Sequence, residues 1–398
     1  MNAENCNEPH GGSLVNLLAD DQRTAKLQEI VFNLPDITLN DRQLCDLELL
    51  ATGAFSPLKG FMSRSDYESV LDRMRLQNDL LWPIPIYLDV DELQAHKLEV
   101  GQSVALRDPE GFLLAIMHIE DIWQADRQKE AARVYGTADR NHPGTDYLFS
   151  RSGQYYLGGP LEVISIPLHF DFKQLRMTPE EIRATFKKLG WKRMTGFLTH
   201  NPIHRPQFEM TINAMQQART NLLLLPIVGM TRPGDFDHYT RVRCYRHVVR
   251  HYPPDSHILS MLPLAMRMSG PREALLHAII AKNYGCTHFI TGRDHAGPGP
   301  DDNGQPYYES DEASKLAETH SQEIGLTVVP FTEMVYLPFE DEYRCADQVP
   351  EGTQVISLSG SDIRKRIRTG RRIPEWATFP EVVEELQKAY PPPRRQGF

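Results

Sequence analysis

Two short polar segments hold the side chains best suited to bind a phosphate or a similar oxyanion. The first, MTGFLTHNPIHRPQ, covers residues 194–207. Its pattern predicts a buried strand, a polar loop and then a helix in which Pro206 is the first residue, because a missing N–H is tolerated there. Such an arrangement directs backbone N–H groups and a helix N-terminus at a phosphate.

The second segment, FITGRDHAGPG, covers residues 289–299. Gly292 and Gly297 permit close approach of the backbone to a ligand. Arg293 offers a planar guanidinium that matches phosphate oxygens. Taken alone, the segment is equally compatible with an ordinary glycine-rich turn that carries a surface ion pair, since short motifs match by chance.

A third segment, SLSGSDIR, covers residues 357–364 and is a further phosphate candidate. Ser359 or Ser361 is predicted to cap a helix that runs to Thr369, with Gly370 after its end. Residues 364–372 are strongly basic and could add positive potential, although a solvated helix end is the favoured interpretation. The histidines 247, 251 and 277 are expected to be surface or packing residues, because no spacing typical of a metal site is present.

The elements that position these segments follow a regular order from about Thr178. Helices are predicted over 179–189, 207–218, 239–251, 271–284 and 309–324, and strands over 194–198, 222–228, 257–263, 287–291 and 327–330. Such alternation indicates βαβ units and a parallel sheet with right-handed crossovers. Ligands bind at the carboxyl ends of strands in these sheets, where the first two segments fall.

The earlier part of the chain has a different pattern, with short β-like runs at 82–90, 103–106, 113–118 and 161–166 separated by glycine and proline. We therefore expect a mostly β domain over 1–167, an α/β domain over 168–325 and a small subdomain over 326–390. The proline cluster at 391–393 predicts a linker over 391–398.

Composition narrows the class of protein. The chain has 398 residues, 40% of them hydrophobic, and a net charge of −10, which argues against a general nucleic-acid-binding protein but not against an anionic substrate. Five scattered cysteines form no CxxC pair, so neither a zinc site nor a disulfide framework is indicated. The N-terminus does not resemble a secretory signal, and we find no membrane-spanning run. These features predict a cytoplasmic protein with no membrane or nucleic-acid partner.

The motifs together resemble those of the ATP sulfurylase (sulfate adenylyltransferase) family. The family's Gly-Arg-Asp-His-Ala-Gly motif is intact at residues 292–297. Residues 55–62, 266–274 and 373–382 resemble further family segments, so that the resemblance extends from about Gly11 to the end. It implies an α/β protein with a PUA-like N-terminal domain, a Rossmann-like nucleotidyltransferase domain and a small C-terminal subdomain.

The resemblance also implies a reaction and its residues. In the family, a sulfate oxygen attacks the α-phosphorus of ATP, carried as its Mg²⁺ complex, to give adenylyl sulfate and pyrophosphate; no protein-bound metal is expected. Carried over by position, the catalytic residues are Thr199, His200 and Asn201, the sulfate-binding residues are Leu198, His200 and Ala296, and the ATP-binding residues are His204, Gln207, Gly292, Arg293, Asp294, His295 and Met334.

Three of these positions depart from the family pattern, which reads Gln-Thr-Arg-Asn followed by Pro-x-His-x-x-His. Here Leu198 replaces the glutamine, His200 the arginine and Gln207 the second histidine. A neutral imidazole lacks the permanent charge and paired donors of a guanidinium, and loss of one preorganised donor typically lowers the rate about 10²- to 10³-fold. Three functions therefore stay open: a working sulfate adenylyltransferase, an impaired scaffold or regulatory domain, and a nucleotidyltransferase for another oxyanion.

The ending PPPRRQGF resembles the junction at which some ATP sulfurylases continue into an adenylylsulfate kinase domain. The resemblance therefore implies a homo-oligomer and, as one alternative, the N-terminal part of a bifunctional ATP sulfurylase and adenylylsulfate kinase.

Overall fold

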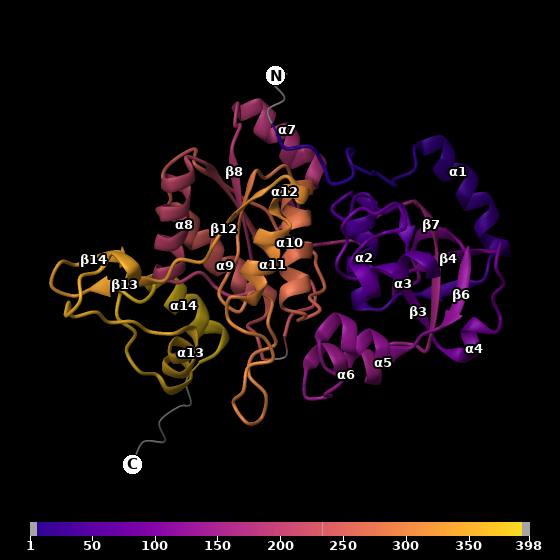
Figure 1. Cartoon of the computed structure of the whole chain (residues 1–398). Coiled ribbons are helices and arrows are strands. Elements are labelled where there is room, and N and C mark those ends of the chain that lie inside the picture. The colour runs from indigo at the N-terminus through magenta and orange to yellow at the C-terminus, as the bar shows by residue number, and fades with distance from the viewer. Residues whose placement is uncertain (1–5, 233, 392–398) are drawn as a thin grey trace, which may run out of the picture.

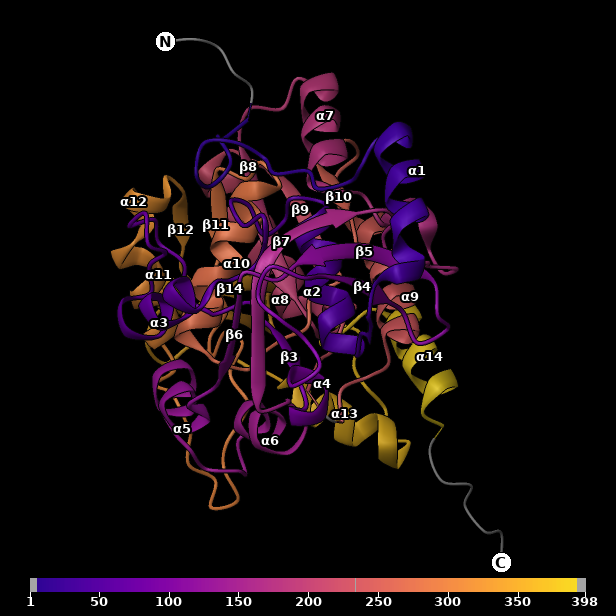
Figure 2. The same ribbon diagram turned by 90° about the vertical axis from the view of Figure 1, so that its right-hand side faces the viewer.

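The computed structural model describes residues 6–232 and 234–391 of the 398-residue chain. An N-terminal domain, a central α/β domain and a C-terminal subdomain follow one another across the molecule (Figure 1). In the view of Figure 2, the strands of the N-terminal domain lie in front of the central domain. Residues 392–398, which include most of the predicted linker, lie outside the described residues.

The N-terminal domain is built on a mixed sheet with the order β1-β4-β5-β7-β2, in which β3 and β6 also pair with β7. Its strands are β1 (Asp36–Thr38), β2 (Gly60–Phe61), β3 (Leu88–Val90), β4 (Ser103–Arg107), β5 (Leu113–His118), β6 (Asp121–Gln124) and β7 (Tyr155–Val163). Its helices are α1 (Asp21–Ile30), α2 (Asp41–Ala51), α3 (Arg64–Arg73), α4 (Glu92–Ala95), α5 (Arg127–Glu130) and α6 (Pro143–Ser150). The domain therefore contains more helix than the sequence pattern suggested.

Strand β7 can meet so many partners because it carries glycine where other backbones cross it. A Cβ at Gly158 would lie 2.2 Å from the carbonyl oxygen of Met62, and one at Gly159 would lie 1.9 Å from that of His118. The expected strand over 82–90 is confirmed only as β3. Pro83 and Pro85 supply no N–H for a ladder, which explains the shorter strand.

The central domain confirms the predicted alternation. Its sheet is parallel, with the order β10-β9-β8-β11-β12. Its strands are β8 (Met194–Thr199), β9 (Asn221–Pro226), β10 (His257–Leu259), β11 (His288–Ile290) and β12 (Thr327–Val329). Its helices are α7 (Pro179–Leu189), α8 (Arg205–Ala218), α9 (His238–Val248), α10 (Pro271–Asn283), α11 (Glu312–Thr319) and α12 (Ser321–Ile324).

Two helix predictions needed correction. The single helix expected over 309–324 is divided into α11 and α12, and the Thr319 hydroxyl donates to the Lys315 carbonyl (2.8 Å) at the division. Such a local side-chain bond competes with the helical ladder. Helix α8 begins at Arg205, so that Pro206 is its second residue rather than its first.

The parallel sheet is buried on both faces, as its apolar strands predict. Side chains alternate along β8: Leu198 packs in the core that contains α10 and the N-terminal domain, and Phe197 packs in the core that contains α8, α9 and the C-terminal subdomain. The C-terminal subdomain comprises β13 (Met334–Leu337), β14 (Glu342–Cys345), α13 (Gly360–Thr369) and α14 (Pro380–Ala389). Ser359 caps α13 and Gly370 ends it with φ 66°, as predicted.

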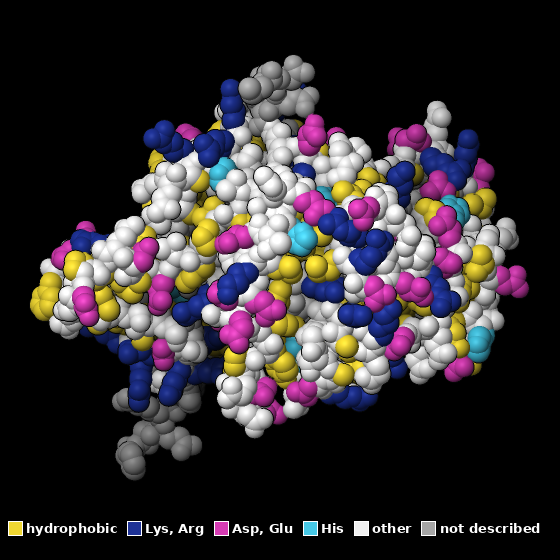
Figure 3. All heavy atoms as spheres, viewed as in Figure 1, with side chains coloured by type: hydrophobic (Ala, Val, Ile, Leu, Met, Phe, Trp, Pro, Cys, Tyr) yellow, Lys and Arg dark blue, Asp and Glu magenta, His cyan; other side chains and the backbone are white. Residues whose placement is uncertain are grey.

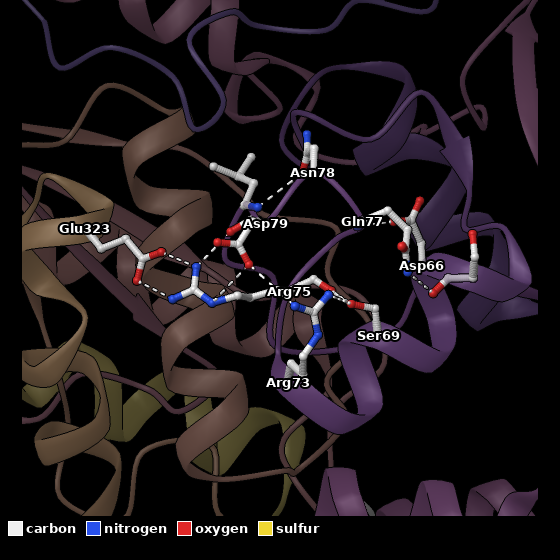
Figure 4. A network of polar contacts seen from close by, with 10 residues as sticks. Asp66, Ser69, Arg73, Arg75, Gln77, Asn78, Asp79 and Glu323 are labelled. Carbon is white, nitrogen blue, oxygen red and sulfur yellow. Dashed lines mark hydrogen bonds and ion pairs between the residues drawn. The ribbon is translucent and has the colours of Figure 1, made fainter.

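Polar contacts join the N-terminal domain to helices α10 and α12 of the central domain. Arg272 donates to the carbonyls of Val70, Leu71 and Pro83 at 3.2, 3.0 and 3.1 Å. Arg75 lies between Asp79 and Glu323 of α12, and its guanidinium binds the Glu323 carboxylate at 2.5 Å (Figure 4). The domain interface is therefore built from both buried backbone contacts and a more exposed ion pair.

Acidic and basic side chains are interspersed over the face in Figure 3, with Lys and Arg side chains gathered at the lower edge of the C-terminal subdomain. Within the described ranges, no helix is both long and apolar enough to cross a membrane.

Candidate active site

The two polar segments converge at one edge of the parallel sheet, as predicted. Strands β8 and β11 are parallel neighbours, with His288 opposite Thr195, so that their carboxyl ends face the same way. A third loop, which follows β9, joins the two segments: Arg232 donates from Nη1 to the Pro298 carbonyl at 3.1 Å. Asp235 of that loop lies beside the first segment, with its Oδ2 3.7 Å from Nε2 of His200.

Helix α9 fixes the backbone of the first loop. Arg241, which is 2% exposed, donates from Nη1 to the carbonyls of His200 (2.8 Å) and Ile227 (2.7 Å). The Tyr245 hydroxyl donates to the Asn201 carbonyl at 2.6 Å. Because side chains of α9 bind both loop carbonyls, the loop is preorganised. The Asn201 side chain stays exposed.

His200 carries no charge at neutral pH. Burial lowers its pKa to about 4, even though the nearby Asp235 carboxylate favours the charged form. The side chain is mostly buried, and the Asn201 amide lies 3.2 Å from its Nε2. An imidazole in this state can offer one hydrogen bond to an anion but no positive charge.

Leu198 and Gln207, the other departures from the family pattern, are both engaged within the protein. Leu198 is 3% exposed and packs in the core shared with α10. Gln207 Oε1 accepts the N–H of His204 at 3.2 Å and so caps α8.

The start of α8 is covered by the C-terminal subdomain, which corrects the expectation that this helix end faces a phosphate. The Arg205 N–H donates to the Ala377 carbonyl at 3.2 Å. His204 Nδ1 lies 2.8 Å from the Thr378 hydroxyl, and burial together with Arg364 lowers the pKa of His204 to about 4. Donors that would meet an anion are thus already bound to protein.

Residues 292–297 of the second segment form a strained turn in which the left-handed residues are not the two glycines. Asp294 and Ala296 have φ values of 52° and 53°, and the Gly297 N–H closes the turn on the Asp294 carbonyl at 3.0 Å. The Ala296 carbonyl accepts the N–H of Gly270 at 3.1 Å. Left-handed conformations of residues other than glycine cluster at functional sites, where surrounding contacts maintain them.

His295 and Arg293 have opposite environments within this turn. His295 is 7% exposed; its Nδ1 accepts the Gly292 N–H at 3.0 Å and its Nε2 lies 2.8 Å from Nδ1 of His277. Arg293 has a side chain that is 58% exposed, held by Glu333 at 3.8 Å. The Arg293 guanidinium is therefore accessible to a ligand despite its ion pair with Glu333, whereas His295 is enclosed within the turn.

Comparison with known proteins identifies the family. The family model "ATP-sulfurylase" matches residues 173–389, and the model "PUA-like domain" matches residues 7–166. A sulfate adenylyltransferase of Mycosarcoma maydis is 47% identical over 98% of this chain and 69% of its own length. One of Schizosaccharomyces pombe is 48% identical over 94% of this chain and 76% of its own length.

The chain belongs to the ATP-sulfurylase family. A solved structure described as a hexameric APS kinase from Thiobacillus denitrificans superposes with a TM-score of 0.81 at 32% identity, and covers 98% of this chain and 70% of that chain. The expected PUA-like domain, α/β fold and nucleotidyltransferase class are thus confirmed.

Of the site residues that the family resemblance implies, the structure brings together Thr199, His200, Asn201 and the 292–297 turn at one sheet edge. It places His204 and Gln207 at the covered start of α8, and Met334, 9% exposed, in the core that contains α8 and α9. Sequence reasoning missed the supporting residues Arg232, Asp235, Arg241, Tyr245 and His277. The position of Arg232 and Asp235 in a polar loop after a buried strand could have indicated them, as could the i, i+4 spacing of Arg241 and Tyr245.

Among the described residues, no group of three or more His, Cys, Asp or Glu side chains is arranged to hold a metal ion.

Proposed function

We propose that this chain transfers the adenylyl group of ATP to sulfate. In this reaction a sulfate oxygen forms a bond to the α-phosphorus of ATP, and the bond from that phosphorus to the oxygen leading to the β-phosphate breaks. The products are adenylyl sulfate and pyrophosphate, and ATP would be supplied as its Mg²⁺ complex. The observation that carries the proposal is the intact 292–297 turn beside the 199–201 loop, in a chain related over nearly its full length to sulfate adenylyltransferases.

The protein's contribution to such a transfer is positioning and charge stabilisation rather than covalent chemistry. Arg293 is the exposed guanidinium best placed to bind phosphate oxygens. The Asn201 amide and the Thr199 hydroxyl stand on the preorganised loop opposite. His295 and His204 act in this proposal through the shape of the turn and of the α8 start.

The acceptor side is weaker than in the family pattern. His200 is neutral at pH 7, and Leu198 presents hydrocarbon where the family has an amide. We therefore propose a slow sulfate adenylyltransferase, about 10²- to 10³-fold slower than a relative with arginine at that position.

A steady-state assay of pyrophosphate release tests this proposal. Purified chain with Mg²⁺-ATP should release pyrophosphate only when sulfate is added, and Arg293→Ala should abolish the signal. Release that does not depend on sulfate, or that is unaffected by Arg293→Ala, would contradict it.

A specific observation favours a second candidate, an impaired scaffold or regulatory domain. All three departures from the family pattern serve the protein's own interior: Leu198 in the core, His200 beside Asp235, and Gln207 as a helix cap. Under this candidate the chain binds ATP without turnover. A calorimetric titration with ATP, followed by assays with other tetrahedral oxyanions, separates it from a nucleotidyltransferase that uses another acceptor.

Assembly and location are proposals of the same kind. The structural neighbour is described as hexameric, which supports a homo-oligomer here. All five cysteines are free thiols, which suits a reducing compartment such as the cytoplasm. A fused adenylylsulfate kinase stays a prediction.

A further inference from the structure

A buried chain of polar groups runs from the candidate nucleotide turn into helix α10. The Gly292 N–H donates to His295 Nδ1 at 3.0 Å, and His295 Nε2 lies 2.8 Å from His277 Nδ1. The two rings meet edge to face, with centroids 5.0 Å apart at 73°. His277 Nε2 then faces the Glu273 carboxylate at 3.7 Å.

These contacts allow one arrangement of protons. A backbone N–H can only donate, so His295 Nδ1 must be the acceptor and His295 must carry its proton on Nε2. That proton points at His277 Nδ1, which must accept in turn. His277 then carries its own proton on Nε2, toward Glu273. The two hydrogen bonds therefore point from the turn toward α10, and His277 Nε2 faces the Glu273 carboxylate at 3.7 Å without a hydrogen bond.

The far end of this chain is anchored to the N-terminal domain. Glu273 is fully buried, and its carboxylate accepts the N–H groups of Arg267 (2.8 Å) and Ser269 (3.1 Å). The Arg267 guanidinium binds Asp46 of α2 at 2.5 Å. The carboxylate that faces His277 is therefore held in place by contacts on both sides of the domain interface.

We propose that His277 is a positioning residue of the active site, which acts through His295 to hold the Gly292–Gly297 turn in its strained shape. The inference rests on the proposed function for the identity of the ligand, a nucleoside triphosphate. Neither histidine needs to touch that ligand. Each ring nitrogen of His295 is already occupied, so losing the acceptor on His277 frees the ring to rotate and releases the Gly292 N–H.

Substitution of His277 in the full-length chain separates this role from simple packing. His277→Leu fills similar space but removes the acceptor. His277→Asn places an amide oxygen near the position of Nδ1 and can still accept the His295 proton. His277→Gln keeps an amide but moves it beyond that position. His10→Leu is the matched control, because it removes a buried imidazole that binds the Leu81 carbonyl at 2.7 Å, in the N-terminal domain.

Hydrogen exchange of peptides that contain Gly292 is the primary measurement, because it requires no nucleotide. We expect at least tenfold faster exchange in His277→Leu and His277→Gln, and exchange within threefold of the wild type in His277→Asn and His10→Leu. If the Leu variant fails to fold, the comparison of Gln with Asn decides. Unchanged exchange in the Gln and Leu variants, or equal disturbance in all three, would overturn the inference.

ATP affinity, measured by calorimetry, is the second readout. It should fall about tenfold in the Gln and Leu variants and survive in His277→Asn. If the wild-type chain binds no ATP, the proposed function fails while the exchange data still decide the role of His277. If it binds ATP and the Gln and Leu variants bind equally well, the role of His277 fails and the proposed function stands.

Discussion

Among the candidate site residues, His200 is the least suited to binding sulfate, because it is mostly buried and uncharged. An anionic acceptor entering the site would meet an imidazole whose pKa burial has lowered to about 4. Arg232 and Arg241 lie close by, but they are engaged with the backbone at Pro298, Ile227 and His200. Supplying a guanidinium at this position is therefore the most informative single change.

We predict that His200→Arg raises sulfate-dependent pyrophosphate release, by about 10-fold to 10²-fold if one preorganised donor is restored. The Asp235 carboxylate has a buried oxygen without a hydrogen-bond partner, 3.9 Å from Arg232, and can hold the new guanidinium in place. Steady-state kinetics at saturating ATP measure the effect. His200→Gln, which adds no charge, is the control and should leave the rate within a few fold.

Adding Leu198→Gln to His200→Arg should raise the rate further, and Gln207→His should add to the gain. The Leu198 site is a packed core, so the introduced amide should also lower the free energy of unfolding by about 1–3 kcal/mol. Rates and denaturant unfolding measured on the same samples separate the two effects. If the reverted chain stays folded but gains no rate, the acceptor assignment is wrong.

At the scale of elements, the candidate site depends on α9 holding the loop that follows β8. Two side chains four residues apart, Arg241 and Tyr245, bind the carbonyls of consecutive loop residues. The loop is short and has no regular structure of its own. Its conformation is thus set by this helix rather than by local propensity.

We expect Tyr245→Phe to leave the Asn201 carbonyl unpaired and to reduce both stability, by about 1–2 kcal/mol, and ATP affinity. Chemical denaturation and calorimetric titration provide the two readouts. Tyr252→Phe is the matched control, because its hydroxyl is equally buried but pairs with Thr211 at 2.6 Å, away from the loop. The control should lose comparable stability and bind ATP normally. Equal loss of affinity in both variants would mean that the loop is not specifically held by Tyr245.

At the scale of the whole molecule, the contacts between the N-terminal and central domains differ widely in strength. Arg272 satisfies three backbone carbonyls from a partly buried position. The Arg75–Glu323 pair in Figure 4 is more exposed, with side-chain exposures of 26% and 36%. Exposed pairs contribute little because solvent screens them, whereas unpaired buried groups are costly.

Arg272→Met should therefore destabilise the protein by about 3 kcal/mol or more, and Glu323→Gln by less than about 1 kcal/mol. Urea unfolding monitored by circular dichroism at one pH compares them directly. High salt should reduce the contribution of Glu323 to the free energy of unfolding and leave the contribution of Arg272 unchanged. Similar losses in the two variants would refute this ranking of the interface contacts.

Buried histidines should make the whole chain less stable in mild acid. Burial lowers the pKa of His10, His142 and His204 to about 4, below the ordinary value of 6.5. Between those values the unfolded chain binds more protons than the folded one. Stability is therefore full above about pH 6.5 and is lost as pH falls toward 4, by about 1–3 kcal/mol for each histidine.

Unfolding free energies measured at pH 7, 6 and 5 should show this decline, and His10→Gln should make it shallower by the contribution of that one histidine. Gln retains a side-chain donor for the Leu81 carbonyl but cannot titrate in this range. A flat profile from pH 7 to 5 in the wild type would contradict the expected contribution of the histidines.

The sequence by itself determined the parallel sheet, the order of its strands and helices along the chain, a helix capped by Ser359 or Ser361, and the sheet edge at which the two polar segments meet. These follow from local patterns: apolar runs, caps and turns, whose physics acts over a few residues. It also determined the family, through motifs spread along the chain.

Only the tertiary structure decided which of the matching residues face a ligand. His204 meets Thr378, and His277, expected to be a surface or packing residue, meets His295; neither pairing is visible in a local pattern. Burial, likewise, is a property of the folded molecule: it leaves His200 uncharged, whereas Arg293 stays exposed. The physical reason is that desolvation and hydrogen-bond partners come from segments far apart in the chain, so a residue's type fixes its chemistry while the fold fixes its state.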